Sequence, residues 1–245
     1  ASDYVQIVRD MDAETPARFN ADKRKLYEAS GSAGKLAVFA VRLDTFEKNP
    51  AEQVFFIGAN SADDLSKLRR HILGSFESLP VSAEYVHREV FDITAKYGKD
   101  TVVMIDKLGT DNLPTFFALK GAIDARLRKI PLMGNFTDRV MQMAARVWPT
   151  VLPKRMTDFR DRFEHHLILK MKNDGIDEAT AWLPEFVKGI DADFFACTPR
   201  EAKIAGLHRF AAAGAAVRYM AIHGSEVEDI IALDIALRRN DRDWL

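Results

Sequence analysis

A glycine turn followed by an apolar run is the segment of this sequence best suited to hold a ligand. Residues 31–43 read GSAGKLAVFAVRL, so four small residues precede alternating bulky side chains. Because glycine has no side chain, such a turn lets the backbone approach a flat or phosphorylated ligand closely. The same spacing also fits an ordinary strand entered through a glycine turn, and the pattern alone favours that plainer interpretation.

Two arginines in apolar surroundings are candidates for binding an acidic group. Arg42 lies in the apolar stretch 39–46, and Arg218 lies in the stretch 214–220, which reads as a strand. A buried Arg is costly unless it is paired, so each arginine either meets an acidic partner or binds a carboxylate ligand in bidentate fashion. Structural pairing is the more ordinary outcome for either residue.

Histidine and cysteine provide little basis for metal or thiol chemistry. Cys197 is the only cysteine, and burial as a small apolar residue is its expected role. His165 and His166 are adjacent, so on a strand they would point to opposite faces and could not bind one metal ion together. His208 precedes the alanine-rich run 211–216, which allows close packing against a ligand or a helix. We expect no metal site.

The charge of the chain is unevenly distributed. The whole chain carries −1, but residues 107–162 contain eleven basic and five acidic side chains and therefore carry +6, which leaves −7 elsewhere. Aromatic, methionine and aliphatic residues alternate with these cations. This mixture suits a lipid headgroup boundary, where each cation near an anionic surface contributes about 1 kcal/mol. The predicted membrane-binding residues are Lys107, Lys120, Arg126, Arg128, Lys129, Arg139, Arg146, Lys154, Arg155, Arg160 and Arg162.

Other interpretations of this basic segment are a solvated helical face and a nucleic-acid surface. Phosphates attract Lys and Arg in either a lipid or a nucleic acid. However, the acidic remainder and the lack of a nucleic-acid motif favour a membrane surface, and we expect no nucleic-acid partner.

Hydrophobic periodicity predicts an α+β fold. Expected strands cover residues 35–45, 53–59, 166–171 and 193–197, and expected helices cover 61–76, opened by a capping box at 61–64, and 178–188. This order suggests two β-α-β units that form an antiparallel sheet covered by helices, a cap of the ferredoxin-like kind.

A helical, basic insertion is predicted to separate the two units. It runs from about residue 87 to 163, is punctuated by four prolines, and has its clearest helices at 112–129 and 137–148, each with a good N-cap residue. A further amphipathic helix is expected at 226–239.

Several longer stretches of the sequence resemble a known protein family. The GSAGKL turn resembles the closing motif of the FAD domain in flavoproteins of the vanillyl-alcohol-oxidase type. Residues 33–46, 97–100, 104–111, 207–216 and 226–241 are similar to the middle portion of quinone-dependent D-lactate dehydrogenases of bacterial inner membranes.

The resemblance implies a respiratory flavoenzyme that oxidises D-lactate to pyruvate and passes electrons through FAD to membrane quinone. It places Gly34 and Val38 against FAD, makes Arg42 and His208 candidates for substrate binding, and implies peripheral attachment at the cytoplasmic face of the inner membrane. The family's main FAD-binding text and its later Glu-His run do not occur here, so the chain is expected to be an excised, inactive piece. The alternative is a non-catalytic membrane-surface or partner-binding module.

The expected domain organisation follows from these assignments. Residues 1–44 would close an FAD-binding domain and supply its last strand. Residues 45–86, 164–201 and 226–245 would form the cap, or substrate, domain. Residues 87–163 and 202–225 would form the membrane-binding region.

Overall fold

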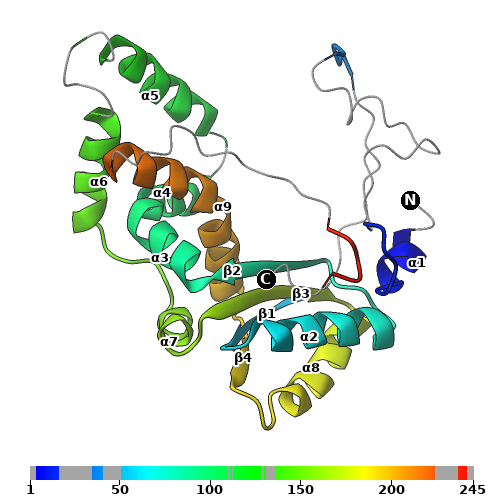
Figure 1. Cartoon of the computed structure of the whole chain (residues 1–245). Coiled ribbons are helices and arrows are strands. Elements are labelled where there is room, and N and C mark those ends of the chain that lie inside the picture. The colour runs from blue at the N-terminus through cyan, green and yellow to red at the C-terminus, as the bar shows by residue number, and fades with distance from the viewer. Residues whose placement is uncertain are drawn as a thin grey trace.

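A four-stranded antiparallel sheet forms the centre of the molecule (Figure 1). The strands are β1 (Glu52–Ala59), β2 (Ser82–His87), β3 (His165–Lys172) and β4 (Ala192–Ala196), arranged in the order β2-β3-β1-β4. The computed structural model describes residues 4–16, 35–40, 51–109, 111, 113–127, 130, 136–223 and 237–241. The fold is therefore α+β, as predicted from the sequence.

Helices cover both faces of this sheet. On one face, α2 (Ala62–Ser75) and α8 (Asp174–Phe186) pack against Phe55 and Ile57 of β1. On the other face, α3 (Arg88–Tyr97), α7 (Lys154–Arg162) and α9 (Pro199–His223) pack against Val54 and Phe56. Successive side chains of a strand point to opposite faces, so this one apolar strand contributes to both cores.

Three of the four strands in the sheet were predicted, and one edge strand was not. The structure contains β1, β3 and β4 close to their predicted bounds, but β2 was not predicted. Its sequence, SAEYVH, is only partly buried and mixes polar with apolar residues, so it lacks a strong strand pattern. With β2 in place, the chain contains the two β-α-β units, β1-α2-β2 and β3-α8-β4.

Two helix starts differ in detail from the expectations. Helix α8 begins at Asp174, four residues before its predicted start. Helix α2 begins at the predicted place, but Ser61 makes no side-chain cap hydrogen bond. The capping box is therefore not formed, and the Asp64 carboxylate accepts a hydrogen bond from Lys67 at 2.7 Å.

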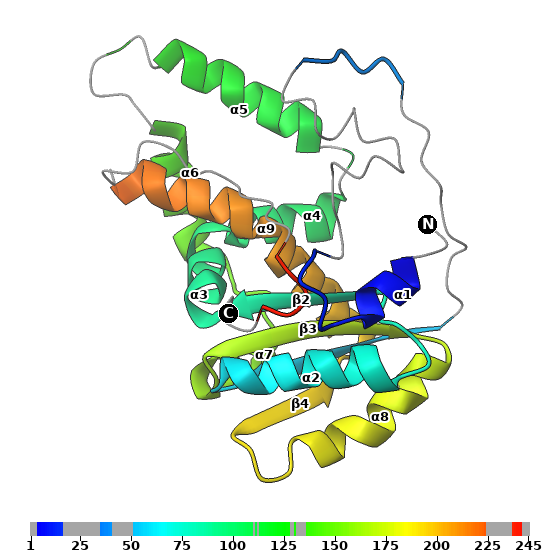
Figure 2. The ribbon, with the colours of Figure 1, turned by 45° about the vertical axis from the view of Figure 1, so that its right-hand side comes forward.

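The insertion is helical and extends away from one side of the sheet (Figure 2). Its helices α3 and α7 pack on the sheet, and α4 (Lys99–Leu108), α5 (Leu113–Leu127) and α6 (Phe136–Val147) lie farther from it. The predicted helices 112–129 and 137–148 are confirmed as α5 and α6. Both views place α5 farthest from the sheet, with α4, α6 and the end of α9 between α5 and the strands.

Helix α9 corrects one expectation. The stretch 214–220 was expected to read as a strand, but it lies within this single helix of 25 residues. Alanine is the strongest helix former, and buried Ala211, Ala215 and Arg218 follow helical spacing. The alanine-rich run therefore packs one face of a helix against α3 and α4.

The terminal segments meet beside α2. Arg9, at the end of α1 (Tyr4–Arg9), donates to the carbonyl oxygen of Leu73 at 2.8 Å. Arg238 forms a β-bridge with Pro16, so the predicted helix 226–239 does not extend to its expected end. The rest of that helix lies outside the described residues. Of the predicted strand 35–45, the structure describes residues 35–40, which have no regular secondary structure because no described strand pairs with them.

Candidate functional site

Five of the predicted membrane-binding cations are paired with carboxylates. The pairs are Lys120–Asp138 at 3.1 Å, Lys154–Asp158 at 2.7 Å, Arg155–Glu201 at 2.6 Å, Arg160–Asp92 at 2.5 Å and Arg162–Asp193 at 2.9 Å. In each pair the carboxylate offsets the charge of the cation, so the pair attracts a distant anionic surface less than an unpaired cation would. Three of them also join segments far apart in the sequence, so these cations have a structural role, and their contact with lipid stays a prediction.

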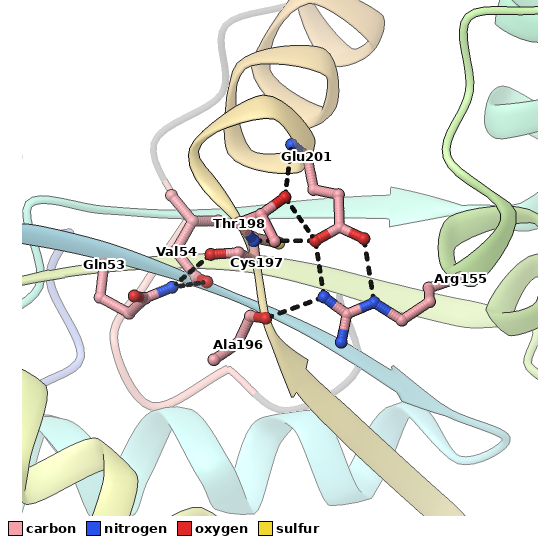
Figure 3. Close-up of polar contacts among 7 residues, drawn as sticks. All are labelled: Gln53, Val54, Arg155, Ala196, Cys197, Thr198 and Glu201. Carbon is pink, nitrogen blue, oxygen red and sulfur yellow. Dashed lines mark hydrogen bonds and ion pairs between the residues drawn. The ribbon is translucent and has the colours of Figure 1, made fainter.

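Arg155 shows this structural role most clearly (Figure 3). Its guanidinium donates to both carboxylate oxygens of Glu201, at 2.9 and 2.6 Å, and to the carbonyl oxygen of Ala196 at 3.1 Å. It also lies 4.3 Å from the centre of the Phe195 ring. The hydrogen bonds from Arg155 lower the pKa of Glu201 to about 2, so this carboxylate stays charged. Arg155 thus fastens the start of α9 to α7 and β4.

Glu201 also completes a capping box that the sequence analysis missed. The backbone N–H of Thr198 donates to the Glu201 carboxylate at 2.8 Å, and the backbone N–H of Glu201 donates back to the Thr198 hydroxyl at 3.3 Å. The signal is present in the sequence as Thr198-Pro199-Arg200-Glu201, a capping box with proline at the first helical position. It marks the true start of α9.

Four other predicted cations have exposed side chains. They are Lys107 at the end of α4, Arg126 on α5, and Arg139 and Arg146 on α6. No carboxylate in the described part of the chain pairs with them. Their charge is therefore available to an external partner. Arg128 and Lys129 lie outside the described residues.

Apolar side chains are exposed on the same helices. Val147 is 82% exposed, and Met143 and Val140 also face outward from α6. Exposed apolar residues on α5 include Leu119 and Ile123. We call the exposed residues of α5 and α6, together with Lys107, the α5–α6 surface. A mixture of exposed cations and exposed apolar side chains on neighbouring helices is typical of an interaction surface.

A buried network of charges holds this surface in place. Arg218 on α9 donates to Asp100 on α4 at 2.5 Å and to the carbonyl oxygen of Tyr97 at 2.9 Å. Its Nε lies 3.7 Å from Asp138 on α6, which accepts a hydrogen bond from Lys120 on α5. The prediction that Arg218 meets an acidic partner is confirmed. Because Arg218 and Asp100 are both buried away from water, separating them would be costly, and the network fixes how α4, α5, α6 and α9 pack together.

The predicted substrate and cofactor residues are not brought together among the described residues. His208 is buried, with its ring centre 4.3 Å from that of Phe91, and burial lowers its pKa to about 4. This placement is that of a neutral packing residue. Val38 is 54% exposed, beside the almost fully exposed Phe39. Gly34 and Arg42 lie outside the described residues, so the roles of all four stay predictions.

The structure also shows where the cysteine and the two adjacent histidines lie. Cys197 is buried, and burial raises the pKa of its thiol to about 12, so it is not a reactive thiolate. His166 is fully buried under α3, while His165 lies on the opposite face and makes a 2.7 Å hydrogen bond to the Tyr85 hydroxyl. In the described ranges no three His, Cys, Asp or Glu side chains gather as metal ligands would.

Two cavities adjoin the sheet, and neither was predicted. A polar cavity of about 440 Å³ lies between the sheet and the start of α9 and contains Gln53, Glu84, Lys170 and Lys203. An apolar cavity of about 280 Å³ lies under α2, between Leu65, Leu68 and the strands. Both lysines of this cavity are already paired with carboxylates, Lys170 with Glu52 at 2.6 Å and Lys203 with Asp106 at 2.9 Å.

Among the described helices, none combines the length and the apolar character that crossing a bilayer requires.

Comparisons with known proteins identify the family. Residues 54–245 match the family described as "D-lactate dehydrogenase, membrane binding", so the chain belongs to it. Similar proteins named quinone-dependent D-lactate dehydrogenase occur in Escherichia coli K12, 60% identical over 99% of this chain, and in Haemophilus influenzae, 51% identical over 98%. One from Corynebacterium glutamicum is 41% identical over the whole chain. The chain spans 43% of the length of each of these relatives.

Proposed function

We propose that this chain is the part of a quinone-dependent D-lactate dehydrogenase that attaches the enzyme to an anionic membrane surface. The observation that carries the proposal is the α5–α6 surface, where four exposed cations without a described carboxylate partner lie among exposed apolar side chains. Membrane attachment would be peripheral, at the cytoplasmic face of the bacterial inner membrane. The family match and the named relatives support the assignment.

In this proposal the whole enzyme oxidises D-lactate to pyruvate. FAD held beside Gly34 and Val38 would supply the hydride and electron-transfer chemistry, and the protein would bind and orient the substrate. The half-exposed Val38 fits a surface that a cofactor covers, and Gly34 would allow close backbone approach. Replacing Gly34 by Val in the full-length enzyme should lower its flavin content, measured by absorbance. Unchanged flavin content would reduce the motif to a structural turn.

The sheet would serve as the substrate cap in this enzyme. We propose a ferredoxin-like arrangement for it, supported by the two β-α-β units and by the strand order β2-β3-β1-β4. The cap would comprise residues 45–86, 164–201 and 226–245, with 87–163 and 202–225 as the membrane-binding region and 1–44 as the end of the FAD domain. The substrate carboxylate would be bound by Arg42 or His208, as the family resemblance implies.

The membrane proposal is tested by co-sedimentation of the 245-residue chain with lipid vesicles. One variant changes Arg126, Arg139 and Arg146 to Gln. A matched variant changes Lys67, Lys172 and Lys188 to Gln, which removes the same charge from the sheet layer. At about 1 kcal/mol per cation, the first variant should bind vesicles rich in anionic lipid roughly 100-fold more weakly.

Three outcomes decide the proposal. The matched variant should bind like the native chain, binding should fall as the anionic lipid is replaced by neutral lipid, and it should weaken with salt, because the Debye length shrinks from about 10 Å at 0.1 M to about 3 Å at 1 M. If both variants bind equally, or if lipid charge has no effect, the α5–α6 surface is only solvated. Dye-linked D-lactate oxidation by the isolated chain would contradict the inference that it is an inactive part.

A further inference from the structure

A cluster of two tyrosines and one histidine joins the ends of α3 and α9. The Tyr97 hydroxyl lies 2.7 Å from Nε2 of His223. The Tyr219 ring centre lies 4.6 Å from that of His223 and 5.4 Å from that of Tyr97. The three rings therefore form one group joined by a hydrogen bond and by edge-on and tilted ring contacts, although Tyr97 is more than 120 residues from the other two in the sequence.

One end of this cluster is buried and the other is open. Tyr97 is 4% exposed, whereas Tyr219 is 38% exposed and His223 faces solvent. When the Tyr97 hydroxyl donates to Nε2, the proton of neutral His223 is on Nδ1, and no described residue accepts a hydrogen bond from that atom. The cluster thus presents an aromatic face and a hydrogen-bond donor to the outside.

The surrounding residues hold the cluster rigidly. Arg218, next to Tyr219, donates to the carbonyl oxygen of Tyr97 and to buried Asp100. Gln142 on α6 donates to the carbonyl oxygen of Lys96 at 2.9 Å, and the Lys96 ammonium lies 5.1 Å from the centre of the Tyr97 ring. A fixed donor loses little conformational entropy when it binds a ligand, which favours binding.

The cluster lies at the membrane-facing end of the molecule. Both ribbon views show the end of α9 beside α6, and α5 on the same side, away from the sheet (Figures 1 and 2). The α5–α6 surface is on these helices. A ligand dissolved in the bilayer would therefore reach Tyr219 and His223 more directly than the cavities beside the sheet.

From this geometry we propose that Tyr97, Tyr219 and His223 bind the headgroup of a lipid-soluble quinone. The inference rests on the proposed function. The quinone ring stacks on Tyr219, and one of its carbonyl oxygens accepts a hydrogen bond from His223. In the reaction, D-lactate loses two electrons and two protons to become pyruvate, and the quinone gains two of each to become a quinol. A donor beside a quinone oxygen favours the reduced product, because that oxygen gains negative charge and then a proton.

A comparable pair elsewhere in the chain provides the control. The Tyr85 hydroxyl lies 2.7 Å from Nδ1 of His165, and their rings are stacked with centres 5.9 Å apart. This pair has the same chemistry, but it lies on the sheet, away from the α5–α6 surface. A change at His165 therefore tests whether the loss of any tyrosine–histidine pair has the same effect.

The experiment measures D-lactate oxidation by the full-length, membrane-bound enzyme with ubiquinone-1 and, separately, with a water-soluble dye as electron acceptor. We expect Tyr219→Ala and His223→Phe each to raise the KM for ubiquinone-1 at least tenfold and to leave the dye-linked rate and vesicle binding unchanged. His165→Gln should leave the KM for ubiquinone-1 unchanged. The conservative Tyr219→Phe should keep most of the affinity, since it keeps the stacking ring.

The two proposals fail in different ways. If the native enzyme does not oxidise D-lactate with the dye, the proposed function is wrong. If dye-linked oxidation is normal and neither Tyr219→Ala nor His223→Phe changes the KM for ubiquinone-1, the cluster only packs two helices together and the quinone site lies elsewhere. An equal rise in KM in the His165→Gln variant would also overturn the assignment.

Discussion

Removing the arginine at the centre of the buried network should strongly destabilise the helical layer. Arg218 and Asp100 are only 8% and 5% exposed, and one carboxylate oxygen of Asp100 already has no hydrogen-bond partner in the described structure. Arg218→Met removes the cation and leaves the Asp100 charge buried without compensation. Breaking a buried pair in this way costs about 3–5 kcal/mol.

An exposed pair provides the comparison. Arg162 and Asp193 are 55% and 39% exposed, so Arg162→Met should cost about 0–1 kcal/mol. For a chain of this size, about 1 kcal/mol lowers Tm by about 2–4 °C, so Arg218→Met should lower Tm by about 6–20 °C and Arg162→Met by at most about 4 °C.

Thermal unfolding followed by circular dichroism measures both variants. The double variant Arg218→Met/Asp100→Leu should recover most of the lost stability, because it removes both charges and keeps apolar volume in their place. The reasoning is refuted if Arg218→Met is no less stable than Arg162→Met. It is also refuted if the effects of the two changes in the double variant simply add.

Two further predictions concern the core. The pKa of His208 is lowered by burial to about 4, below its ordinary 6.5, so the native state binds fewer protons than the unfolded state between these values. Stability should therefore be constant above pH 6.5 and fall by up to about 3 kcal/mol as the pH drops to about 4. In the His208→Leu variant, the stability measured by urea unfolding should fall much less as the pH drops. Some pH dependence should persist because burial also lowers the pKa of His166. The same pH dependence in the variant and the native chain would contradict this. Gly58→Ala should cost about 1–3 kcal/mol, because its Cβ would lie 2.2 Å from the Phe163 ring, and the added Phe163→Leu change should remove most of the clash. Equal stability of Gly58→Ala and the native chain would show that the ring can move aside.

Local patterns were sufficient to predict the parts of the fold whose signals lie within one element. The apolar sequences of β1 and β3 indicate their strands directly. Strand β2 could not be predicted in this way, because its short sequence mixes polar with apolar residues, and its pairing with β3 stabilises it as a strand. The alanine-rich text of α9 is compatible with several structures, and only the overlooked capping box at Thr198 marks the start of the helix.

The candidate site could be predicted from the sequence only in part. Eleven cations could be counted, but which of them are neutralised depends on partners far away in the chain: Arg155 pairs across 46 residues and Arg160 across 68. The tyrosine–histidine cluster likewise exists only because α3 and α9 pack together. Sequence composition therefore predicts the sign of the surface, while the fold decides where that charge is available.

The continuity of α9 has a mechanical consequence. At about 1.5 Å per residue, its 25 residues follow about 37 Å of helix axis, which bends between the sheet and α6 (Figures 1 and 2) and is held by Arg155 near its start and by Arg218 near its end. A helix held at both ends sets the distance between the sheet and the α5–α6 surface. Adding one residue to its middle would lift the sheet by about 1.5 Å and swing it by about 100°. The length of this helix therefore determines both the distance and the orientation of the sheet relative to the α5–α6 surface.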